Sequence, residues 1–386
     1  MSRAAPFPAP SPDAMQHSNR MTQHILSEIA ASGGWIPFSR YMELALYAQG
    51  LGYYTAGSQK FGEAGDFVTA PETSALFGRT LAKQTIEIME ASAPHILELG
   101  AGSGKLALDM LGELERRGCL PESYSILEVS ADLRERQKSR LRESLPHLFG
   151  RVQWLDHLPG HFNGAIVANE VLDALPVHLV HWQENQPSEI GVTTDGSGFV
   201  FAERAISDVQ LMKAAGKISV EGDYVSEICL ACRGLIKSLA ETLGQGAMIF
   251  MDYGFGAREY YHPDRTRGTL MCHYRHRAHD DPFFLPGLQD ITSHVNFTDI
   301  AETGIDSGLE VLGYTTQAFF LINNGITELL KEIPPEDAKT YLPLSAQLQR
   351  LTSPAEMGEL FKVLALGKNL ETTLTGFCFG DLTRLL

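Results

Sequence analysis

Two kinds of apolar pattern alternate along the chain. Short runs in which nearly every residue is apolar are followed by longer stretches in which apolar residues recur three and four positions apart. The first kind is typical of a buried strand and the second of an amphipathic helix, so the alternation predicts a parallel, doubly wound α/β sheet. The predicted strands are residues 95–100, 124–130, 151–156, 164–171 and 247–254, and helices are predicted up to Arg117, up to about Leu145 and from about Val225 to Leu243.

The segments on either side of these strands give further elements. Helical spacing from Met21 to about Met89, interrupted by a glycine-rich and aromatic stretch, predicts a helical cap ahead of the sheet. Residues 177–205 alternate and turn like a β-hairpin inserted after the fourth strand, with Asp195 and Gly196 at the turn. Two final strands are predicted at residues 309–317 and 360–368.

The N-terminal stretch, residues 1–20, is rich in proline, alanine and serine. It lacks the apolar segment of about seven to fifteen residues that a secretory signal needs, and a mitochondrial presequence would be richer in arginine. We therefore expect a disordered tail here. No apolar run reaches about eighteen residues, so no transmembrane helix is predicted.

Charge and cysteine usage narrow the possible functions. The formal net charge of -16 repels nucleic acid phosphates, so nucleic acid is a poor candidate for the substrate. The cysteines are odd in number and scattered through a long chain, unlike the disulfide framework of a small secreted protein. A cytoplasmic protein is the expectation. The five cysteines are Cys119, Cys229, Cys232, Cys272 and Cys378.

The stretch ILELGAGSGK, residues 96–105, carries a glycine at every second position directly after the first predicted strand. A phosphate-binding P-loop needs glycine five residues before Gly104 and serine or threonine after Lys105, but the chain has Leu99 and Leu106. A dinucleotide fingerprint needs a third glycine where Lys105 stands, which weakens that possibility without removing it. Three glycines still let a ligand approach the backbone and the N–H groups of the helix that follows.

Carboxylates at three successive strand ends suggest the charge of that ligand. Glu98 precedes the glycines, Glu128 ends the second strand at about the spacing of an acid that binds ribose hydroxyls, and Asp156 ends the third. A carboxylate repels pyrophosphate and attracts an ammonium group, so S-adenosylmethionine meets this demand better than NAD does. The alternative for Glu128 and Asp156 is a carboxylate that caps a helix or a turn.

Residues 255–300 form a long connection rich in arginine, histidine and proline, and long loops beyond the strands of an α/β sheet often carry function. Its histidines and Cys272 suggest metal ligands at first sight. However, Arg275 and Arg277 would repel a cation, and no second cluster completes a tetrahedral set, so we predict no metal site. We expect Arg267, Arg275 and His279 to form a lid that binds an acidic substrate surface or stabilises the crevice.

Several segments, in this order and spacing, resemble the MidA-like family of class I S-adenosylmethionine-dependent methyltransferases, whose mitochondrial member is a complex I assembly factor acting as a protein arginine methyltransferase. The resemblance runs from about Ile25 to Gly380. At Ala101 relatives often carry proline, which changes the stiffness of the loop. The matching segments are residues 65–78, 98–104, 127–137, 168–178, 252–254, 267–283, 286–297 and 357–368.

The resemblance implies a Rossmann-like seven-stranded class I methyltransferase sheet whose last strand is antiparallel, with an N-terminal helical cap and a β-hairpin and loop insertion. The corresponding division is a disordered tail at 1–20, a helical cap and cofactor-covering loop at 21–84, and a methyltransferase domain at 85–386. Insertions are expected at about 177–220 and 255–300.

The resemblance also places the segment around Asp66 and Thr69 over the cofactor, where Asp66 would hold the methionine ammonium and Thr69 its carboxylate. The alternative is that Thr69 caps a helix and Glu72 completes a capping box. The expected cofactor-binding residues are Asp66, Thr69, Glu98, Gly100, Ala101, Gly102, Gly104, Glu128, Asp156 and Asn169.

Methyl transfer from a sulfonium chiefly needs alignment. A guanidinium acceptor also needs carboxylates, because its pKa exceeds about 12 and its charge is delocalised. We expect Glu170 to be the main guanidinium partner and Asp173 the second, since residues three apart on a helical turn share a face. Alternatively, Asp173 caps a short helix before Pro176. The other expected substrate-binding residues are His178, Asp252, Tyr253, Arg267, Arg275 and His279.

The sequence therefore predicts an S-adenosylmethionine-dependent methyltransferase acting on a protein side chain, arginine by analogy with the family. An alternative is an assembly factor that binds the cofactor but transfers little. A weaker alternative is a NAD-dependent oxidoreductase. A protein substrate is expected, and neither nucleic acid nor a membrane.

Overall fold

The computed structural model describes residues 7–56, 69–184 and 186–386. These residues form two compact units, and each unit is assembled from three separate segments. The first unit comprises Met1–Phe67, Ala174–Ala231 and Tyr261–Ser293, and the second comprises Val68–Asp173, Cys232–Tyr260 and His294–Leu386. The division therefore differs from the continuous boundaries expected at residues 84 and 85, because the N-terminal helices pack with the two inserted segments.

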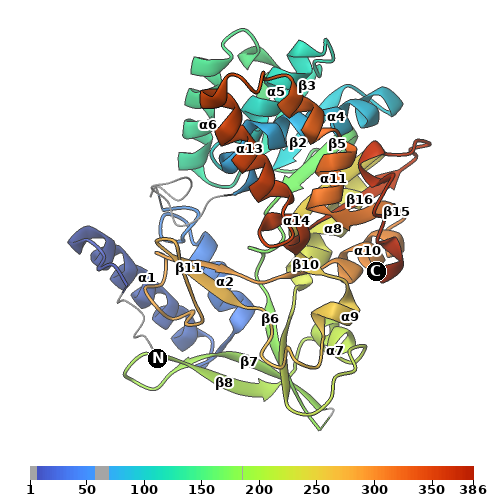
Figure 1. Cartoon of the computed structure of the whole chain (residues 1–386). Coiled ribbons are helices and arrows are strands. Elements are labelled where there is room, and N and C mark those ends of the chain that lie inside the picture. Colours follow the sequence, from blue (N-terminus) through green and yellow to red (C-terminus); the bar gives the residue numbers. More distant parts are fainter. Residues whose placement is uncertain (1–6, 57–68, 185) are drawn as a thin grey trace. The chain divides into compact units, whose positions relative to one another are not determined.

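The second unit contains the sheet that the apolar runs predict (Figure 1). Its strand order is β15-β16-β10-β5-β2-β3-β4, and the short β14 pairs with β10. The strands β4, β3, β2, β5 and β10 run parallel, whereas β16 is antiparallel to both of its neighbours. The strands are β2 (His95–Leu99), β3 (Ser123–Leu127), β4 (Val152–Leu155), β5 (Phe162–Asn169), β10 (Leu243–Phe255), β14 (Val295–Asn296), β15 (Glu310–Thr316) and β16 (Phe361–Lys368).

Several helices of the second unit share a large apolar cluster with one face of this sheet. Side chains such as Ile96, Tyr124, Ala165 and Ile249 point from neighbouring strands into the same cluster and are fully buried. The helices are α3 (Ala70–Thr73), α4 (Ala75–Ala91), α5 (Lys105–Arg116), α6 (Ala131–Ser144), α8 (Leu230–Thr242), α9 (Ala257–Tyr260), α10 (Phe297–Asp306), α11 (Gln317–Asn323), α12 (Ile326–Lys331), α13 (Ala338–Thr352) and α14 (Met357–Leu360), with 3-10 turns at Phe149–Arg151, Thr375–Phe377 and Thr383–Leu385. Of these, α4, α5, α11 and α12 contribute to the cluster. The helix expected from Val225 begins only at Leu230, because the alternating residues before it form a strand.

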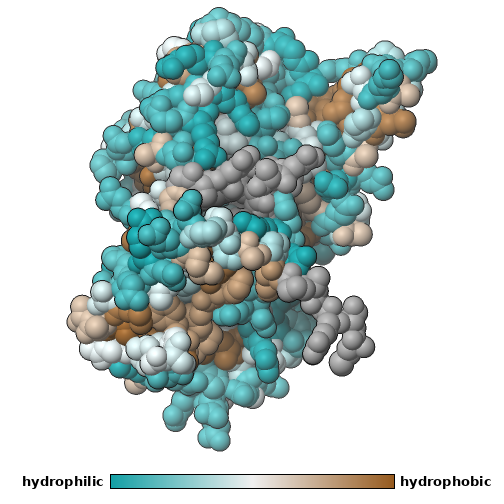
Figure 2. Space-filling model, turned by 90° about the vertical axis from the view of Figure 1, so that its left-hand side faces the viewer, coloured by the Kyte–Doolittle hydropathy of each residue, from teal (hydrophilic) through white to brown (hydrophobic). Residues whose placement is uncertain are grey.

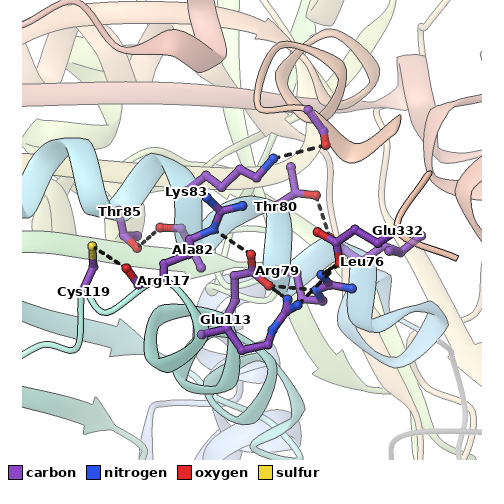
Figure 3. A network of polar contacts seen from close by, with 12 residues as sticks. Leu76, Arg79, Thr80, Ala82, Lys83, Thr85, Glu113, Arg117, Cys119 and Glu332 are labelled. Carbon is purple, nitrogen blue, oxygen red and sulfur yellow. Dashed lines mark hydrogen bonds and ion pairs between the residues drawn. The ribbon is translucent and has the colours of Figure 1, made fainter. Parts of the chain in front are cut away.

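A network of charges joins α4, α5 and the end of α12 (Figure 3). The Glu113 side chain is only 2% exposed, and its carboxylate accepts hydrogen bonds from Arg79 Nε at 2.8 Å and Arg117 Nε at 2.6 Å and also pairs with Arg116. Arg79 pairs in addition with Glu332 at 2.5 Å. A buried carboxylate is costly unless it is paired, so these guanidinium groups are what make its burial tolerable.

The first unit is built on two antiparallel sheets. One has the order β1-β7-β6-β9 with β8 beside β7, and the other has the order β12-β11-β13. Polar residues cover most of the face seen in Figure 2, and apolar residues form separate patches on it. The elements are α1 (Pro12–Ala31), β1 (Ile36–Pro37), α2 (Phe38–Tyr47), β6 (His178–Gln183), β7 (Gln186–Thr194), β8 (Phe199–Ala205), α7 (Val209–Ala215), β9 (Tyr224–Ile228), β11 (Met271–Tyr274), β12 (Arg277–His279) and β13 (Asp290–Thr292).

The expectation of a disordered tail up to residue 20 was wrong, because α1 begins at Pro12. The Ser11 side chain accepts a hydrogen bond from the Ala14 N–H at 3.2 Å, and Pro12 occupies the first helical position. Serine followed by proline is a helix start signal, which the overall composition of the segment concealed. Buried Met21, Ile25 and Ile29 then anchor the helix.

The hairpin at residues 177–205 is confirmed, with β7 and β8 joined at Asp195 and Gly196, but it belongs to a larger sheet. Residues 255–300, predicted as a long connection, contain the short strands β11, β12 and β13. Arg275 and His276 form the turn between β11 and β12, with φ of 47° and 60°. Positive φ at two successive residues is what a tight hairpin turn requires. Within the described part of the chain, no helix is long and apolar enough to cross a membrane.

Candidate functional site

The glycine loop connects β2 to α5 in the second unit. Gly100, Gly102 and Gly104 have φ of 61°, 52° and 78°, a left-handed conformation that glycine adopts at little cost. The loop is held from both ends, since the Gly100 N–H donates to Leu127 O at 3.0 Å and the Gly104 N–H to Ala101 O at 2.8 Å. A Cβ at Gly100 would lie 3.1 Å from the Val171 side chain, so the loop passes close to the segment after β5.

Glu98 lies beneath this loop and does not have the exposure that direct contact with a cationic ligand requires. Its side chain is 2% exposed, and Oε2 accepts a hydrogen bond from the Tyr124 hydroxyl at 2.7 Å. Burial raises the pKa of Glu98 to about 7, the nearby Glu128 adds to the rise, and the Tyr124 hydrogen bond opposes it.

Glu128 follows β3 and is also buried, at 5% exposure. Its Oε1 accepts the Ser130 N–H at 2.9 Å, and its Oε2 accepts from Gln137 Nε2 at 3.1 Å. The position at the carboxyl end of a parallel strand is the one expected of an acid that binds ribose hydroxyls. The structure thus places Glu128 beside the glycine loop with its carboxylate orientation already fixed.

Asp156 follows β4 and differs from the other two acids, because 79% of its side chain is exposed. Arg134 on α6 pairs with Asp156 Oδ1 at 2.6 Å and also donates to the backbone oxygens of Glu128 and Leu155, each at 2.6 Å. Arg134 thus ties together the ends of β3 and β4. The Asp156 carboxylate is accessible to a ligand, but such a ligand would compete with this ion pair.

The segment before α4 was expected to cover the cofactor. Asp66 lies outside the described residues, and Thr69 precedes the single turn α3 without making a capping hydrogen bond through its side chain. Glu72 instead accepts a hydrogen bond from the Ser103 hydroxyl of the glycine loop, so the capping box proposed as an alternative is absent at Thr69. Arg140 donates to the same Ser103 oxygen at 2.8 Å.

Glu170 stands directly after β5 in an unusual conformation. Its φ is 52°, in the left-handed region that glutamate rarely enters, and its N–H donates to Met251 O at 2.8 Å. Glu170 Oε1 accepts from the Ala70 N–H at 3.3 Å and from Asn169 Nδ2 at 3.1 Å. Left-handed residues other than glycine are costly and cluster at functional sites.

Glu170 lies at a bend and Asp173 in the turn that follows, so the two do not share the helical turn that their spacing predicts, and no helix follows for Asp173 to cap. The bend is held by Asp252 at the end of β10, which is 1% exposed. Asp252 Oδ2 accepts the N–H groups of Val171, Leu172 and Asp173 at 3.2, 2.9 and 3.2 Å. Its other oxygen accepts the Tyr253 N–H at 3.0 Å, so both oxygens bind backbone groups.

Tyr253 links this anchor to Asp173. The Tyr253 hydroxyl donates to Asp173 Oδ2 at 2.6 Å, and Asp173 is 6% exposed. Burial raises the pKa of Asp252 well above its ordinary value, and the charges of Asp173 and Glu170 raise it further. A buried acid whose pKa is raised by neighbouring carboxylates at one strand edge is typical of a functional site.

The remaining expected substrate residues belong to the first unit. His178 Nδ1 contacts Glu189 Oε1 at 2.7 Å, and Arg267 is exposed beside β9. Arg275 occupies the hairpin turn and donates to Ala9 O at 3.2 Å. His279 packs edge-on between Phe7 and Phe284, and burial lowers its pKa. Arg267, Arg275 and His279 therefore each have different neighbours.

Gln137 on α6 is a site residue that the sequence did not single out. It is fully buried and contacts the glycine loop, Glu128 and Trp154. Two signals could have found it: Gln137 ends the family-like segment 127–137, and it shares one buried face of an otherwise charged helix with Leu133 and Leu141.

Comparisons with known proteins agree with this geometry. Residues 80–315 match the model of a family described as S-adenosyl-L-methionine-dependent methyltransferases. The zebrafish protein arginine methyltransferase NDUFAF7, mitochondrial, is 30% identical over 380 residues, which cover 89% of this chain and 86% of that protein. Its Drosophila melanogaster homolog is 29% identical, with 87% and 82% covered. A crystal structure from Burkholderia thailandensis with bound S-adenosyl-homocysteine is 47% identical, covers 99% of this chain and all of that chain, and has a TM-score of 0.96.

The chain therefore belongs to this methyltransferase family and is an S-adenosylmethionine-dependent enzyme. The resemblance to MidA-like methyltransferases is confirmed, and so is the α/β fold. The comparisons favour neither the oxidoreductase nor the assembly factor without catalysis.

The residues of the second unit fit this cofactor. Three positions of the loop are left-handed glycines without side chains, and Glu128 follows the neighbouring strand β3. Asn169 Oδ1 at the end of β5 is buried and has no hydrogen-bond partner among the described residues, so it can accept a donor from a ligand. The glycine loop, Glu128 and Asn169 would hold the cofactor.

Proposed function

We propose that this enzyme methylates arginine side chains of a protein substrate, with Glu170 as the residue that binds the guanidinium group. The relatives named as protein arginine methyltransferases support this choice of acceptor. The observation that carries it in this chain is the left-handed Glu170, whose carboxylate is oriented by two hydrogen bonds at the edge of the sheet where the glycine loop lies.

A guanidinium acceptor poses a particular problem, because its charge is spread over three nitrogens and its pKa exceeds about 12. A fixed carboxylate that binds two of its N–H groups holds the plane of the group and draws the positive charge toward itself, which favours a lone pair on the remaining nitrogen. When bound, S-adenosylmethionine supplies a methyl group on a positively charged sulfur whose leaving form is neutral. The task left to the protein is alignment.

Asp173, Tyr253 and Asp252 take supporting roles in this proposal. Asp252 was expected to bind substrate, but its two oxygens are committed to backbone N–H groups and its side chain is buried. We therefore assign it the role of holding the bend that carries Glu170. Tyr253 orients Asp173 through their 2.6 Å hydrogen bond, and Asp173 is the second carboxylate that binds the guanidinium group. His178, Arg267, Arg275 and His279 carry no role in this proposal.

Substitution of Glu170 by glutamine tests the assignment. The amide oxygen can still accept from Ala70 and Asn169, so the fold and the dissociation constant for S-adenosylmethionine should be retained. Transfer of a tritiated methyl group into lysate proteins should fall by at least about a hundredfold, since one charge-assisted pair is lost. Glu184→Gln is a matched control, because Glu184 is another left-handed glutamate, exposed and in the first unit.

The products decide between the alternatives. Mass spectrometry of cells with and without the protein should find methylarginine on at least one protein that depends on Glu170. If the methyl label is found on another residue type, that residue and not arginine is the acceptor. Cofactor binding with no transfer by the wild-type protein would favour the assembly factor instead. We also propose a cytoplasmic location, which fits the five cysteines found free among the described residues.

A further inference from the structure

Helix α6 contacts the glycine loop through a buried glutamine. Gln137 is 0% exposed, and its Nε2 donates to Gly102 O at 2.9 Å and to Glu128 Oε2 at 3.1 Å. Its Oε1 accepts from Trp154 Nε1 at 2.9 Å. The amide orientation is unambiguous, because an indole nitrogen only donates whereas a carbonyl and a carboxylate accept. One side chain thus joins the loop, the acid after β3 and the strand β4.

The loop is shaped to admit this side chain. A Cβ at Gly104 would lie 3.2 Å from Gln137 Cγ and 3.3 Å from its Cα, so glycine is needed there for α6 to approach as well as for the left-handed φ. Gly102, whose oxygen Gln137 holds, is itself left-handed. The hydrogen bond from Gln137 to Gly102 O therefore fixes a backbone segment that glycine alone would leave adaptable.

The contact with Glu128 matters as much as the contact with the loop. The Ser130 N–H fixes Oε1 and Gln137 fixes Oε2, so the carboxylate is oriented before any ligand arrives. Ordering a binding group in advance removes that cost from the binding step. The Glu128 carboxylate is only 5% exposed and lies close to the buried Glu98. Without Gln137 it would lose one hydrogen-bond donor, which is costly for a buried charge.

We propose that Gln137 is a positioning residue that sets the affinity for S-adenosylmethionine, by holding the glycine loop and Glu128 in their binding arrangement. This inference rests on the methyltransferase function but does not depend on arginine being the acceptor. Gln137 does not take part in methyl transfer, so its effect should lie in cofactor affinity and not in the rate at saturation.

Titration calorimetry of the full chain tests this with S-adenosylmethionine and S-adenosylhomocysteine as the probes. Gln137→Met keeps the volume but removes both donors and the acceptor. We expect both dissociation constants to rise by about tenfold to a hundredfold, the effect of one to two lost hydrogen bonds. The KM for the cofactor should rise in parallel, with kcat at saturation within about twofold of wild type. Gln137→Asn, which keeps the amide, should regain part of the affinity.

Gln317→Met is the matched control, because Gln317 on α11 is also 0% exposed in the second unit and donates to Leu351 O at 2.9 Å. It should lower the melting temperature without changing either dissociation constant. If Gln137→Met binds both probes as tightly as wild type, or if Gln317→Met weakens binding as much, the proposal is wrong.

A spectroscopic readout separates positioning from general destabilisation. Replacing Trp35 and Trp182 by phenylalanine leaves Trp154 as the only tryptophan, and its indole donates to Gln137. Adding S-adenosylhomocysteine should shift its emission in that background. In the Gln137→Met version, the shift at saturating ligand should be lost. An unchanged shift would show that the loop does not reach Trp154 through Gln137. The calorimetric and fluorescence measurements use no acceptor, so they stand if the arginine assignment fails.

Discussion

The buried Glu98 gives a prediction whose size follows from the structure. Its pKa rises from 4.5 to about 7 because the side chain is fully buried. Between these values the folded state keeps a proton that the unfolded state has released, so the free energy of unfolding falls as the pH rises. Each pH unit is worth about 1.4 kcal/mol, so the cost grows to about 3 kcal/mol above pH 7 and vanishes well below pH 4.5.

Glu98→Gln removes this cost and keeps an acceptor for the Tyr124 hydroxyl. The stability difference between variant and wild type should therefore favour the variant more at pH 8 than at pH 5, by about 2 kcal/mol. Urea denaturation at both pH values measures it, followed by the emission of Trp154 in the background without Trp35 and Trp182, because Trp154 lies in the second unit. A difference independent of pH, or larger at pH 5, would refute the reasoning.

Tyr124→Phe provides the opposite test of the same idea. The Tyr124 hydrogen bond lowers the pKa of Glu98, so its removal should raise that pKa and steepen the loss of stability between pH 5 and 8. Glu135→Gln on α6 is the control, because this glutamate is exposed and Lys138 lowers its pKa, so it stays charged from pH 5 to 8 and its replacement should leave the pH dependence of unfolding in that range unchanged.

Two further predictions concern the bend that carries Glu170. Asp252→Ala leaves four backbone N–H groups without their acceptor. Urea denaturation should show that the free energy of unfolding falls by about 3–5 kcal/mol, and a loss below about 1 kcal/mol would contradict the anchoring role. Tyr253→Phe removes only the hydroxyl that orients Asp173. Methyl-transfer assays should show a kcat about tenfold lower, and calorimetry an unchanged dissociation constant for S-adenosylmethionine. An equal kcat in both proteins would show that Tyr253 does not support the reaction.

The main sheet could be predicted from the sequence because its strands are continuous apolar runs, which buried parallel strands require on both faces. β2 and β4 fall within the runs that predicted them, and β3, β5 and β10 overlap their runs but begin one, two and four residues earlier. β15 and β16 also fall within their predicted runs. The small sheets of the first unit gave weaker signals. β11, β12 and β13 are three or four residues long and contain histidine, arginine and aspartate, so composition suggested a loop.

Other differences arose because local signals were judged by overall composition. The Ser11 and Pro12 start of α1 follows the ordinary rules for helix termini, yet the surrounding prolines and alanines suggested a tail. At Glu170 a local signal was misleading. The spacing to Asp173 fits a helical turn, but Asp252 accepts hydrogen bonds from the backbone of an irregular bend instead. These hydrogen bonds form because β5 and β10 are neighbours in the sheet, which the local sequence does not show.

The acids show where prediction from sequence reaches its limit at this kind of site. Glu98, Glu128, Asp156 and Asp252 all lie at or next to the carboxyl end of a parallel strand, as the sequence indicated. At such an edge the N–H groups of the following segments converge, and a carboxylate can bind either them or a ligand. Glu128 binds Ser130 N–H and Asp252 binds the bend, whereas Asp156 is exposed and paired with Arg134. Sequence position fixes which edge an acid occupies, but the direction of its oxygens depends on donors that are distant in the chain, such as Gln137 for Glu128 and Tyr124 for Glu98.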